Sequence, residues 1–184
     1  MDSDKPITLL GSGPPPSDWV VRFSSLVPSG GPVLDLACGA GRHSRFFLRR
    51  GDRVTAVDQN LEGIQDIRGH PNLESFEIDL EDGRTFPFQG RSFGALIVTN
   101  YLYRPILRDL VSVVSEGGIL IYETFARGNE RFPGPSNPDF LLKPGELLEA
   151  VRGELRVVAF EDRVVCDPSP AAIQRIAAVR ESAQ

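Results

Sequence analysis

From residue 33 onward, short apolar runs alternate with stretches of helical periodicity, and this alternation is the feature that most constrains the fold. The runs predict strands over residues 33–36, 54–58, 73–79, 93–99 and 119–125. Helices are expected between them, over residues 41–50, 61–68 and 104–114. Strands that are joined through helices pair in parallel, because a parallel connection needs a long crossover. The pattern therefore predicts an α/β domain with a doubly wound, mostly parallel sheet.

Two segments differ in character from this repeating pattern. Residues 11–16 read Gly-Ser-Gly-Pro-Pro-Pro, which excludes a helix or a central strand, so we expect a flexible arm or lid over residues 1–16. Residues 126–142 are rich in glycine and proline and predict a long loop, a kind of connection that is usually functional or mobile. After it we expect a helix over residues 144–151 and a sixth strand over residues 155–160.

One segment near the end of the chain is ambiguous. Over residues 171–179, the spacing of Ile173, Ile176 and Val179 favours a helix, whereas the valine-rich neighbouring segments favour a strand. We assign a strand. No change of composition divides the chain, so residues 1–184 are expected to form a single domain.

Composition and charge narrow the class of partner. The 184 residues carry a net charge of −5 and no run of lysine or arginine, which argues against nucleic acid as a partner. No apolar stretch is long enough to cross a membrane, and the polar start does not resemble a signal peptide. Cys38 and Cys166 are far apart and lie at no metal-ligand spacing with His43 or His70, so we expect no metal site. Free thiols and the lack of an export signal predict a cytoplasmic protein.

Carboxylates follow three consecutive predicted strands. Asp35 ends the first strand, Asp58 the second and Asp79 the third, and a glycine-rich turn at residues 39–41 follows the first. The carboxyl ends of parallel strands meet at one edge of a sheet, where such folds bind ligands. Asp58 stands 19 residues after Gly39, a spacing at which a carboxylate accepts hydrogen bonds from a ribose diol. These residues predict a nucleotide-like cofactor at this edge.

The sequence of this turn distinguishes between two kinds of cofactor. Nicotinamide-binding turns follow the pattern G-x-G-x-x-G, whereas this turn reads Gly39-Ala40-Gly41-Arg42-His43-Ser44. A carboxylate at Asp35 would repel a pyrophosphate but would attract an ammonium or a sulfonium group. S-adenosylmethionine therefore fits these residues better than a nicotinamide dinucleotide.

The segment Val33-Leu34-Asp35-Leu36-Ala37-Cys38-Gly39-Ala40-Gly41 resembles the first motif of the class I S-adenosylmethionine-dependent methyltransferases, and Asp58 and Asp79 match the later ones. The resemblance covers roughly residues 17 to 180. It implies a Rossmann-like sheet of seven strands whose last strand is antiparallel, which supports a strand over residues 171–179. The short chain and the continuation after Gly41 resemble the small-molecule branch of the family, which includes tellurite-resistance and thiopurine-type enzymes.

The resemblance also implies a set of cofactor contacts. Asp58 would hold the ribose, Asp79 with Leu80 the adenine, and Asn100 and Tyr101 would lie beside the methyl group. The first loop, from Asp35 to Gly41, would hold the methionine part. The expected cofactor-binding residues are Asp35, Ala37, Cys38, Gly39, Ala40, Gly41, Asp58, Gln59, Asp79, Leu80, Asn100 and Tyr101.

The acceptor side is less defined. Tyr103, Tyr122 and Glu123 are candidates for the substrate pocket, and Glu123 belongs either to the site or to a salt bridge. No catalytic residue is assigned, because methyl transfer requires alignment and exclusion of water more than it requires a base. The predicted partner is a small molecule, and the residues leave the oligomeric state open. Two alternative functions are a cofactor-binding regulator or scaffold without turnover and a nicotinamide-dependent oxidoreductase.

Overall fold

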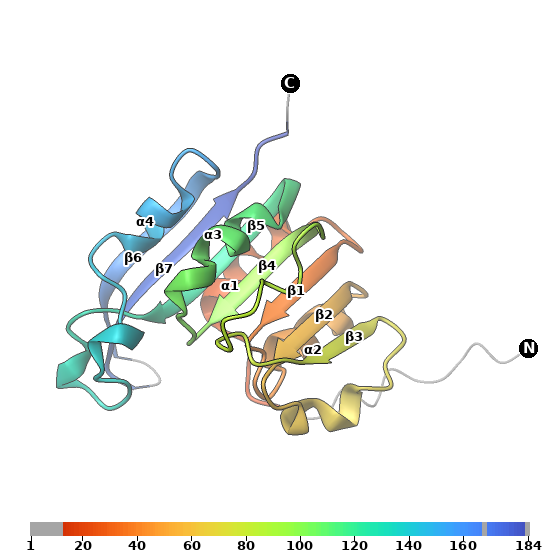
Figure 1. Cartoon of the computed structure of the whole chain (residues 1–184), viewed down its shortest axis with the longest axis horizontal. Helices are drawn as coiled ribbons and strands as arrows, with labels where there is room; N and C mark the ends of the chain where they lie inside the picture. The colour runs from red at the N-terminus through yellow and green to blue at the C-terminus, as the bar shows by residue number, and fades with distance from the viewer. Residues whose placement is uncertain (1–12, 167–168, 183–184) are drawn as a thin grey trace, which may run out of the picture.

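The computed structural model describes residues 13–166 and 169–182, and its strands form one seven-stranded sheet. The spatial order is β3-β2-β1-β4-β5-β7-β6 (Figure 1). Neighbours from β3 to β5 pair in parallel, and β7 runs antiparallel to both β5 and β6. The predicted mostly parallel sheet with an antiparallel last strand is confirmed. The strands are β1 Pro32–Leu36, β2 Arg53–Asp58, β3 Leu73–Glu77, β4 Phe93–Thr99, β5 Val114–Phe125, β6 Arg156–Val165 and β7 Ala171–Val179.

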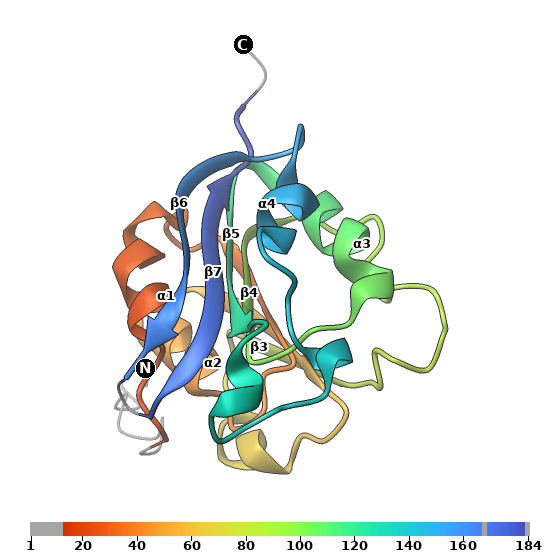
Figure 2. The same cartoon turned by 90° about the vertical axis from the view of Figure 1, so that its left-hand side faces the viewer.

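Helices cover both faces of this sheet. Figure 2 shows α1 and α2 on one side and α3 and α4 on the other. The α-helices are α1 Asp18–Phe23, α2 Arg42–Arg49, α3 Leu107–Ser112 and α4 Glu146–Val151. The 3₁₀ turns of the described chain are η1 Ser24–Leu26, η2 Glu62–Ile67, η3 Arg104–Ile106, η4 Asn129–Arg131 and η5 Pro138–Phe140.

The core is divided by the alternation of side chains along each strand. On β1, Val33 packs toward α1 and α2, whereas Leu34 and Leu36 pack toward α3 and α4. A strand between two helical layers is therefore apolar on both faces, which is why the central strands read as almost continuous apolar runs. Polar groups gather where the parallel strands end, and this places the candidate site.

Two predicted helices differ from the observed elements. The segment predicted at 61–68 forms only the 3₁₀ turn η2, and the segment predicted at 104–114 divides into η3 and the short α3. Pro105 lies in the first turn of η3, where its missing N–H is tolerated but where it cannot continue a preceding helix. Val114 already belongs to β5, because it pairs with Phe93 of β4. Pairing between strands ends the helix here.

Two strands end at other residues than predicted, because their ends are set by strand pairing. The strand predicted at 73–79 ends at Glu77, where its ladder with β2 ends. The strand predicted at 155–160 continues to Val165, because β6 pairs with β7 along the full length of that strand. Residues 171–179 form β7, so the choice of a strand for this segment is confirmed.

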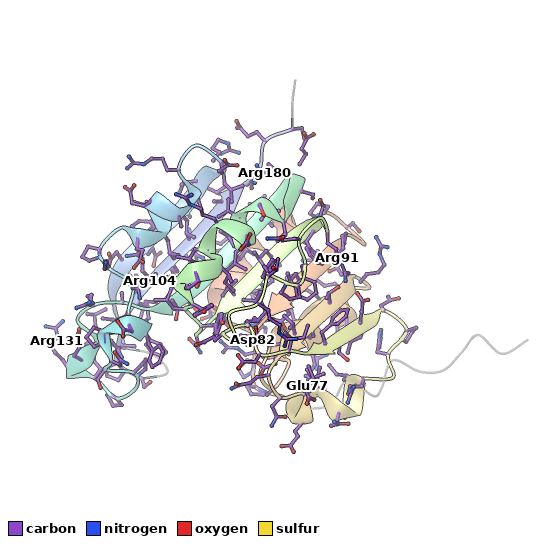
Figure 3. The ribbon with its side chains drawn as sticks, in the orientation of Figure 1. Glu77, Asp82, Arg91, Arg104, Arg131 and Arg180 are labelled. Atoms are coloured by element: carbon purple, nitrogen blue, oxygen red, sulfur yellow. The ribbon has the colours of Figure 1, made fainter. Side chains whose placement is uncertain are left out.

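The long loop at 126–142 is tied at its base. Ala126 and Leu142 form a bridge that closes its neck. Asn129 is buried, and its side chain hydrogen-bonds both to β7 and to the loop itself. Arg104, which lies at the start of η3 and is labelled in Figure 3, donates to two carbonyl groups of the loop. The neck of the loop is therefore held by the sheet and by η3, while its tip is exposed.

Most of the predicted arm, residues 1–12, lies outside the described residues, and residues 13–16 have no regular secondary structure. Within the described parts of the chain, no helix is long and apolar enough to cross a membrane. The same residues include no group of three or more His, Cys, Asp or Glu side chains placed to hold a metal ion.

Candidate functional site

A cavity of about 220 Å³ opens at the carboxyl ends of β1 to β4. β1 pairs with both β2 and β4, so the strand order reverses there, and parallel sheets bind ligands at such a reversal. The lining residues are Ala37, Asp58, Gln59, Ile78, Asp79, Leu80, Glu81, Asn100 and Tyr101. All but Ile78 and Glu81 belong to the set predicted from the sequence. These two flank Asp79 and Leu80 directly, and that adjacency was the only signal for them.

A larger hollow, of about 440 Å³, lies at the opposite end of the sheet. Four of its five charged side chains pair with one another, Arg156 with Glu181 and Arg180 with Glu154, and the fifth is Glu116. These charges need no ligand, and no residue of the predicted set lies there, so we place the candidate site at the first cavity.

The loop after β1 is shaped by three residues with positive φ. Ala37, Gly39 and Gly41 have φ of 53°, 52° and 68°. A Cβ built on Gly39 meets no atom within 4 Å, which leaves open space above the loop. Gly63 of η2 supports the loop from below, because a Cβ there would come within 2.8 Å of the Gly39 carbonyl oxygen. The turn is thus fixed on one side and open on the other.

Asp58 lies at the end of β2, lines the cavity and holds the loop after β1 through a hydrogen bond. Its Oδ2 accepts the N–H of Gly39 at 2.8 Å, and its Oδ1 accepts the N–H of Asn60 at 3.1 Å. Both bonds hold the carboxylate in one orientation at the cavity wall, and each oxygen keeps a lone pair for a ligand hydroxyl. This arrangement fits a bound ribose.

Asp35 is not among the residues that line the cavity, although we expected it to contact the ammonium group of the cofactor. It is buried, and its Oδ2 accepts both the N–H and the Oγ–H of Ser44, at 2.8 and 2.6 Å. Burial raises the pKa of this carboxyl from 3.8 to about 7. Asp35 therefore positions the start of α2. Cys38 is likewise buried and absent from the cavity wall, and burial raises the pKa of its thiol.

His43 lies beside Asp35 and links the loop to α1. Its Nε2 accepts the N–H of Ser17 at 3.2 Å, so the proton of the neutral ring is on Nδ1, which lies 3.9 Å from Asp35 Oδ1. Burial, with a smaller effect of the Arg42 charge, lowers the pKa of His43 from 6.5 to about 3. The imidazole is therefore neutral at physiological pH.

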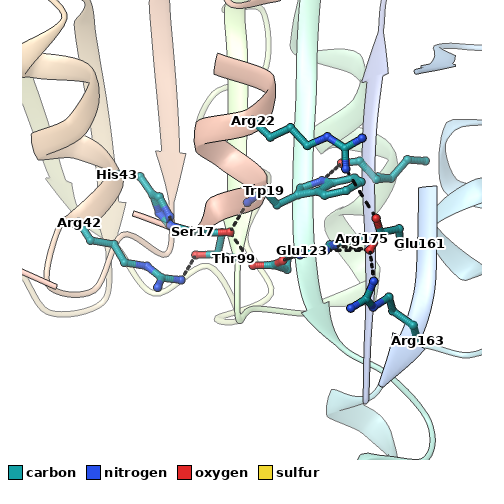
Figure 4. Close-up of polar contacts among 11 residues, drawn as sticks. Ser17, Trp19, Arg22, Arg42, His43, Thr99, Glu123, Glu161, Arg163 and Arg175 are labelled. Atoms are coloured by element: carbon teal, nitrogen blue, oxygen red, sulfur yellow. Dashed lines mark hydrogen bonds and ion pairs between the residues drawn. The ribbon is translucent and has the colours of Figure 1, made fainter. Parts of the chain in front are cut away.

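Glu123 forms a salt bridge, which was one of the two roles expected for it. Its Oε2 accepts from Arg175 Nη1 at 3.0 Å, and its Oε1 accepts the hydroxyl proton of Ser17 at 2.8 Å (Figure 4). Arg175 also pairs with Glu161 at 2.7 Å and lies 4.5 Å from the centre of the Trp19 ring. This cluster attaches the start of α1 to β5, β6 and β7.

The three tyrosines have different positions. Tyr122 is buried in the core, and its hydroxyl donates to the backbone carbonyl of Tyr101 at 2.8 Å, so it does not line the cavity as we expected. Tyr103 is half-buried against the core and is also absent from the cavity wall. Tyr101 lines the cavity, and burial of its hydroxyl, next to the Glu81 carboxylate, raises the pKa of the phenol.

Comparisons with known proteins find similarity to methyltransferases. A family described as a methyltransferase domain matches residues 33–118. The malonyl-[acyl-carrier protein] O-methyltransferase of Salmonella typhimurium is 31% identical over 102 residues, which are 53% of this chain and 40% of that protein. The chain spans less than half the length of the curated relatives it matches.

Solved structures share the fold over most of the chain. TehB from Haemophilus influenzae aligns with a TM-score of 0.71 and 18% identity, covering 90% of this chain and 62% of that one. The glycopeptide N-methyltransferase MtfA, crystallised with S-adenosyl-L-homocysteine, aligns with a TM-score of 0.59 and 20% identity, covering 88% of both chains.

Proposed function

We propose that this chain, which belongs to the class I S-adenosylmethionine-dependent methyltransferases, transfers the sulfonium methyl group of that cofactor to a small-molecule acceptor. The observation that supports it most is the cavity at the strand reversal. Residues that the sequence pattern assigned to the cofactor form most of its wall. When bound, the cofactor supplies an activated methyl group, and the protein contributes binding and orientation.

The residues of the cavity divide the binding of this cofactor among themselves. We assign the ribose hydroxyls to Asp58 and the adenine to Asp79 and Leu80, with Ile78 and Glu81 beside them. The backbone of the first loop would carry the methionine part, since the space above Gly39 is open. Asn100 and Tyr101 would border the position of the methyl group.

Methyl transfer is an in-line displacement, so its rate depends on alignment of donor and acceptor and on exclusion of water. The proposal therefore needs no catalytic base, and we assign none. The loop at 126–142, anchored at its neck, and residues 13–16 lie on either side of the strand ends and would cover the acceptor. A reducing compartment such as the cytoplasm would suit the free thiols of Cys38 and Cys166.

A ligand comparison tests this function directly. In thermal-shift measurements, S-adenosylmethionine and S-adenosylhomocysteine should stabilise the chain, whereas NAD and NADP should not. Stabilisation by NAD or NADP alone would favour an oxidoreductase instead. Formation of S-adenosylhomocysteine from S-adenosylmethionine, measured across a panel of small carboxylic acids, amines, thiols and phenols, separates an enzyme from a binding protein without turnover.

A further inference from the structure

Arg42 is a half-buried cation that forms no ion pair with a carboxylate of the described residues. Five arginines of the described chain are buried or half-buried, and four of them pair with a carboxylate, Arg45, Arg104, Arg175 and Arg180. Arg42 has no carboxylate oxygen within 4 Å among the described residues, and its one hydrogen bond reaches Thr99 Oγ1 at 3.5 Å. That distance is the upper limit for such a bond, so the bond is weak. Charges withdrawn from water normally have a partner.

The carboxylates nearest to Arg42 are already engaged. Thr99 pairs in register with Glu123, but both oxygens of Glu123 accept bonds from Ser17 and Arg175. Asp35 is close enough to Arg42 for the arginine charge to lower its pKa, but burial raises that pKa more strongly, and the hydrogen bonds of Asp35 go to Ser44. Figure 4 shows the Arg42 side chain reaching along the strand ends toward Thr99, clear of the Glu123 cluster. The guanidinium therefore keeps donors free at this edge.

The place of Arg42 relative to the cavity indicates what would use those donors. The wall at Asp58 and Asp79 belongs to the nucleoside end, while Ala37 and Asn100 form the wall toward β1 and β4. Arg42 follows the first loop, and its guanidinium touches Thr99, the neighbour of Asn100. It thus lies next to the part of the wall formed by β1 and β4, the side that remains for the amino-acid part of a nucleoside cofactor.

We propose that Arg42 binds the α-carboxylate of the cofactor's methionine part and thereby selects ligands that carry it. The inference rests on the function proposed above. The carboxylates of Asp58, Asp79 and Glu81 on the cavity wall would repel a ligand carboxylate, so this group needs a cation. A planar guanidinium accommodates a carboxylate with two parallel hydrogen bonds. The charge that meets the methionine part is then that of Arg42 and not that of the buried Asp35.

Two ligands that differ only in this carboxylate test the proposal. Titration calorimetry would compare S-adenosylmethionine with decarboxylated S-adenosylmethionine on the wild type, Arg42→Gln, Arg42→Lys and the control Arg68→Gln, which changes an exposed arginine. We expect Arg42→Gln to weaken S-adenosylmethionine binding by about ten- to a hundredfold and to leave the decarboxylated ligand within about twofold. Arg42→Lys should be intermediate, and Arg68→Gln should match the wild type.

The outcomes separate the two proposals. Equal affinity of the wild type and Arg42→Gln for S-adenosylmethionine overturns the role of Arg42 and leaves the function standing. An equal loss for both ligands also overturns it, because Arg42 would then act by shaping the loop. A wild type that binds neither S-adenosylmethionine nor S-adenosylhomocysteine would refute the function and, with it, this inference. Circular dichroism melts would verify that each variant is folded.

Discussion

Among single residues, the buried pair of Asp35 and His43 has consequences for pH dependence. The folded state raises the pKa of Asp35 to about 7, so from about pH 4 to 7 it keeps a proton that the unfolded chain releases, and stability falls as pH rises. The folded state lowers the pKa of His43 to about 3. From about pH 3 to 6.5 the unfolded chain therefore binds a proton that the folded state does not, and the contribution of His43 to stability rises with pH. The two contributions have opposite sign where the windows overlap.

We therefore expect each single variant to show the slope of the remaining partner. Relative to the wild type, the free energy of unfolding of Asp35→Asn should rise more with pH between pH 4.5 and 6.5. That of His43→Gln should fall over the same range. The difference in slope is at most about 1.4 kcal/mol per pH unit for one group. Urea unfolding at several pH values measures it, and parallel curves for the three proteins would contradict the burial of this pair.

Substitution of Asp58 should weaken binding of the cofactor, because this carboxylate is assigned to the ribose hydroxyls. Asp58→Ala removes the ribose acceptor and releases the N–H of Gly39, so S-adenosylhomocysteine binding should weaken by about 1 to 3 kcal/mol. The fold should persist, because this half-buried carboxylate lies at the strand end, outside the core. Titration calorimetry gives the constant, and Asp58→Asn, which keeps one acceptor oxygen, should lose less. An unchanged dissociation constant for Asp58→Ala would show that the ribose assignment is wrong.

At the level of secondary-structure elements, η2 determines where the cofactor loop can lie. A Cβ on Gly63 would come within 2.8 Å of both the Gly39 carbonyl oxygen and the Ala40 Cα, and these are backbone atoms that cannot rotate away. Gly41 packs as closely, since a Cβ there would come within 2.3 Å of Ile64 Cγ2. The 3₁₀ turn and the glycine loop therefore form one packed unit.

Gly63→Ala should displace this loop. We expect weaker binding of S-adenosylhomocysteine and a loss of stability of about 1 to 3 kcal/mol, the usual effect of overpacking. Gly69→Ala, at the end of the same segment, is the matched control, because a Cβ there meets nothing within 4 Å and its φ is not positive. If the two variants had the same melting temperature and the same affinity, close packing of η2 under the loop would be excluded.

For the whole molecule, the strand ends that form the proposed cofactor site are firmly packed, whereas the loop that we propose covers the acceptor is less constrained. The strand ends are embedded between two helical layers, whereas residues 130–140 of the long loop are mostly exposed beyond a closed neck. Exposed segments with few buried contacts open at low free-energy cost. Such a segment can admit an acceptor and still cover it afterwards.

Hydrogen exchange followed by mass spectrometry should resolve these regions. In the free protein we expect fast exchange at residues 130–140 and slow exchange at the neck around Ala126 and Leu142. S-adenosylhomocysteine alone should slow exchange at the ends of β1 to β3 and leave the loop tip fast. Asn129→Ala should accelerate exchange at the neck, because the buried side chain connects it to β7. Protection of the tip equal to that of the neck in the free protein would argue against a mobile cover.

The sequence by itself determined the α/β architecture and the edge of the sheet that carries the candidate site. The period of the apolar residues distinguishes strands from helices, and buried parallel strands keep that pattern because they are apolar on both faces. Carboxylates at strand ends predicted Asp58 and Asp79 on the cavity wall, since parallel strands bring their carboxyl ends to one edge, and the resemblance to methyltransferase motifs implied most of the other lining residues.

Only the tertiary structure decided which of those groups face the cavity. Asp35 is turned inward by Ser44, Tyr122 is buried in the core, and Glu123 pairs with Arg175, 52 residues away in the chain. The predicted helices at 61–68 and 104–114 were likewise limited by packing and by strand pairing. Burial and charge pairing depend on residues that are distant in sequence, so no local pattern carries them. For the same physical reason, the unpaired charge of Arg42 became visible only in the folded chain.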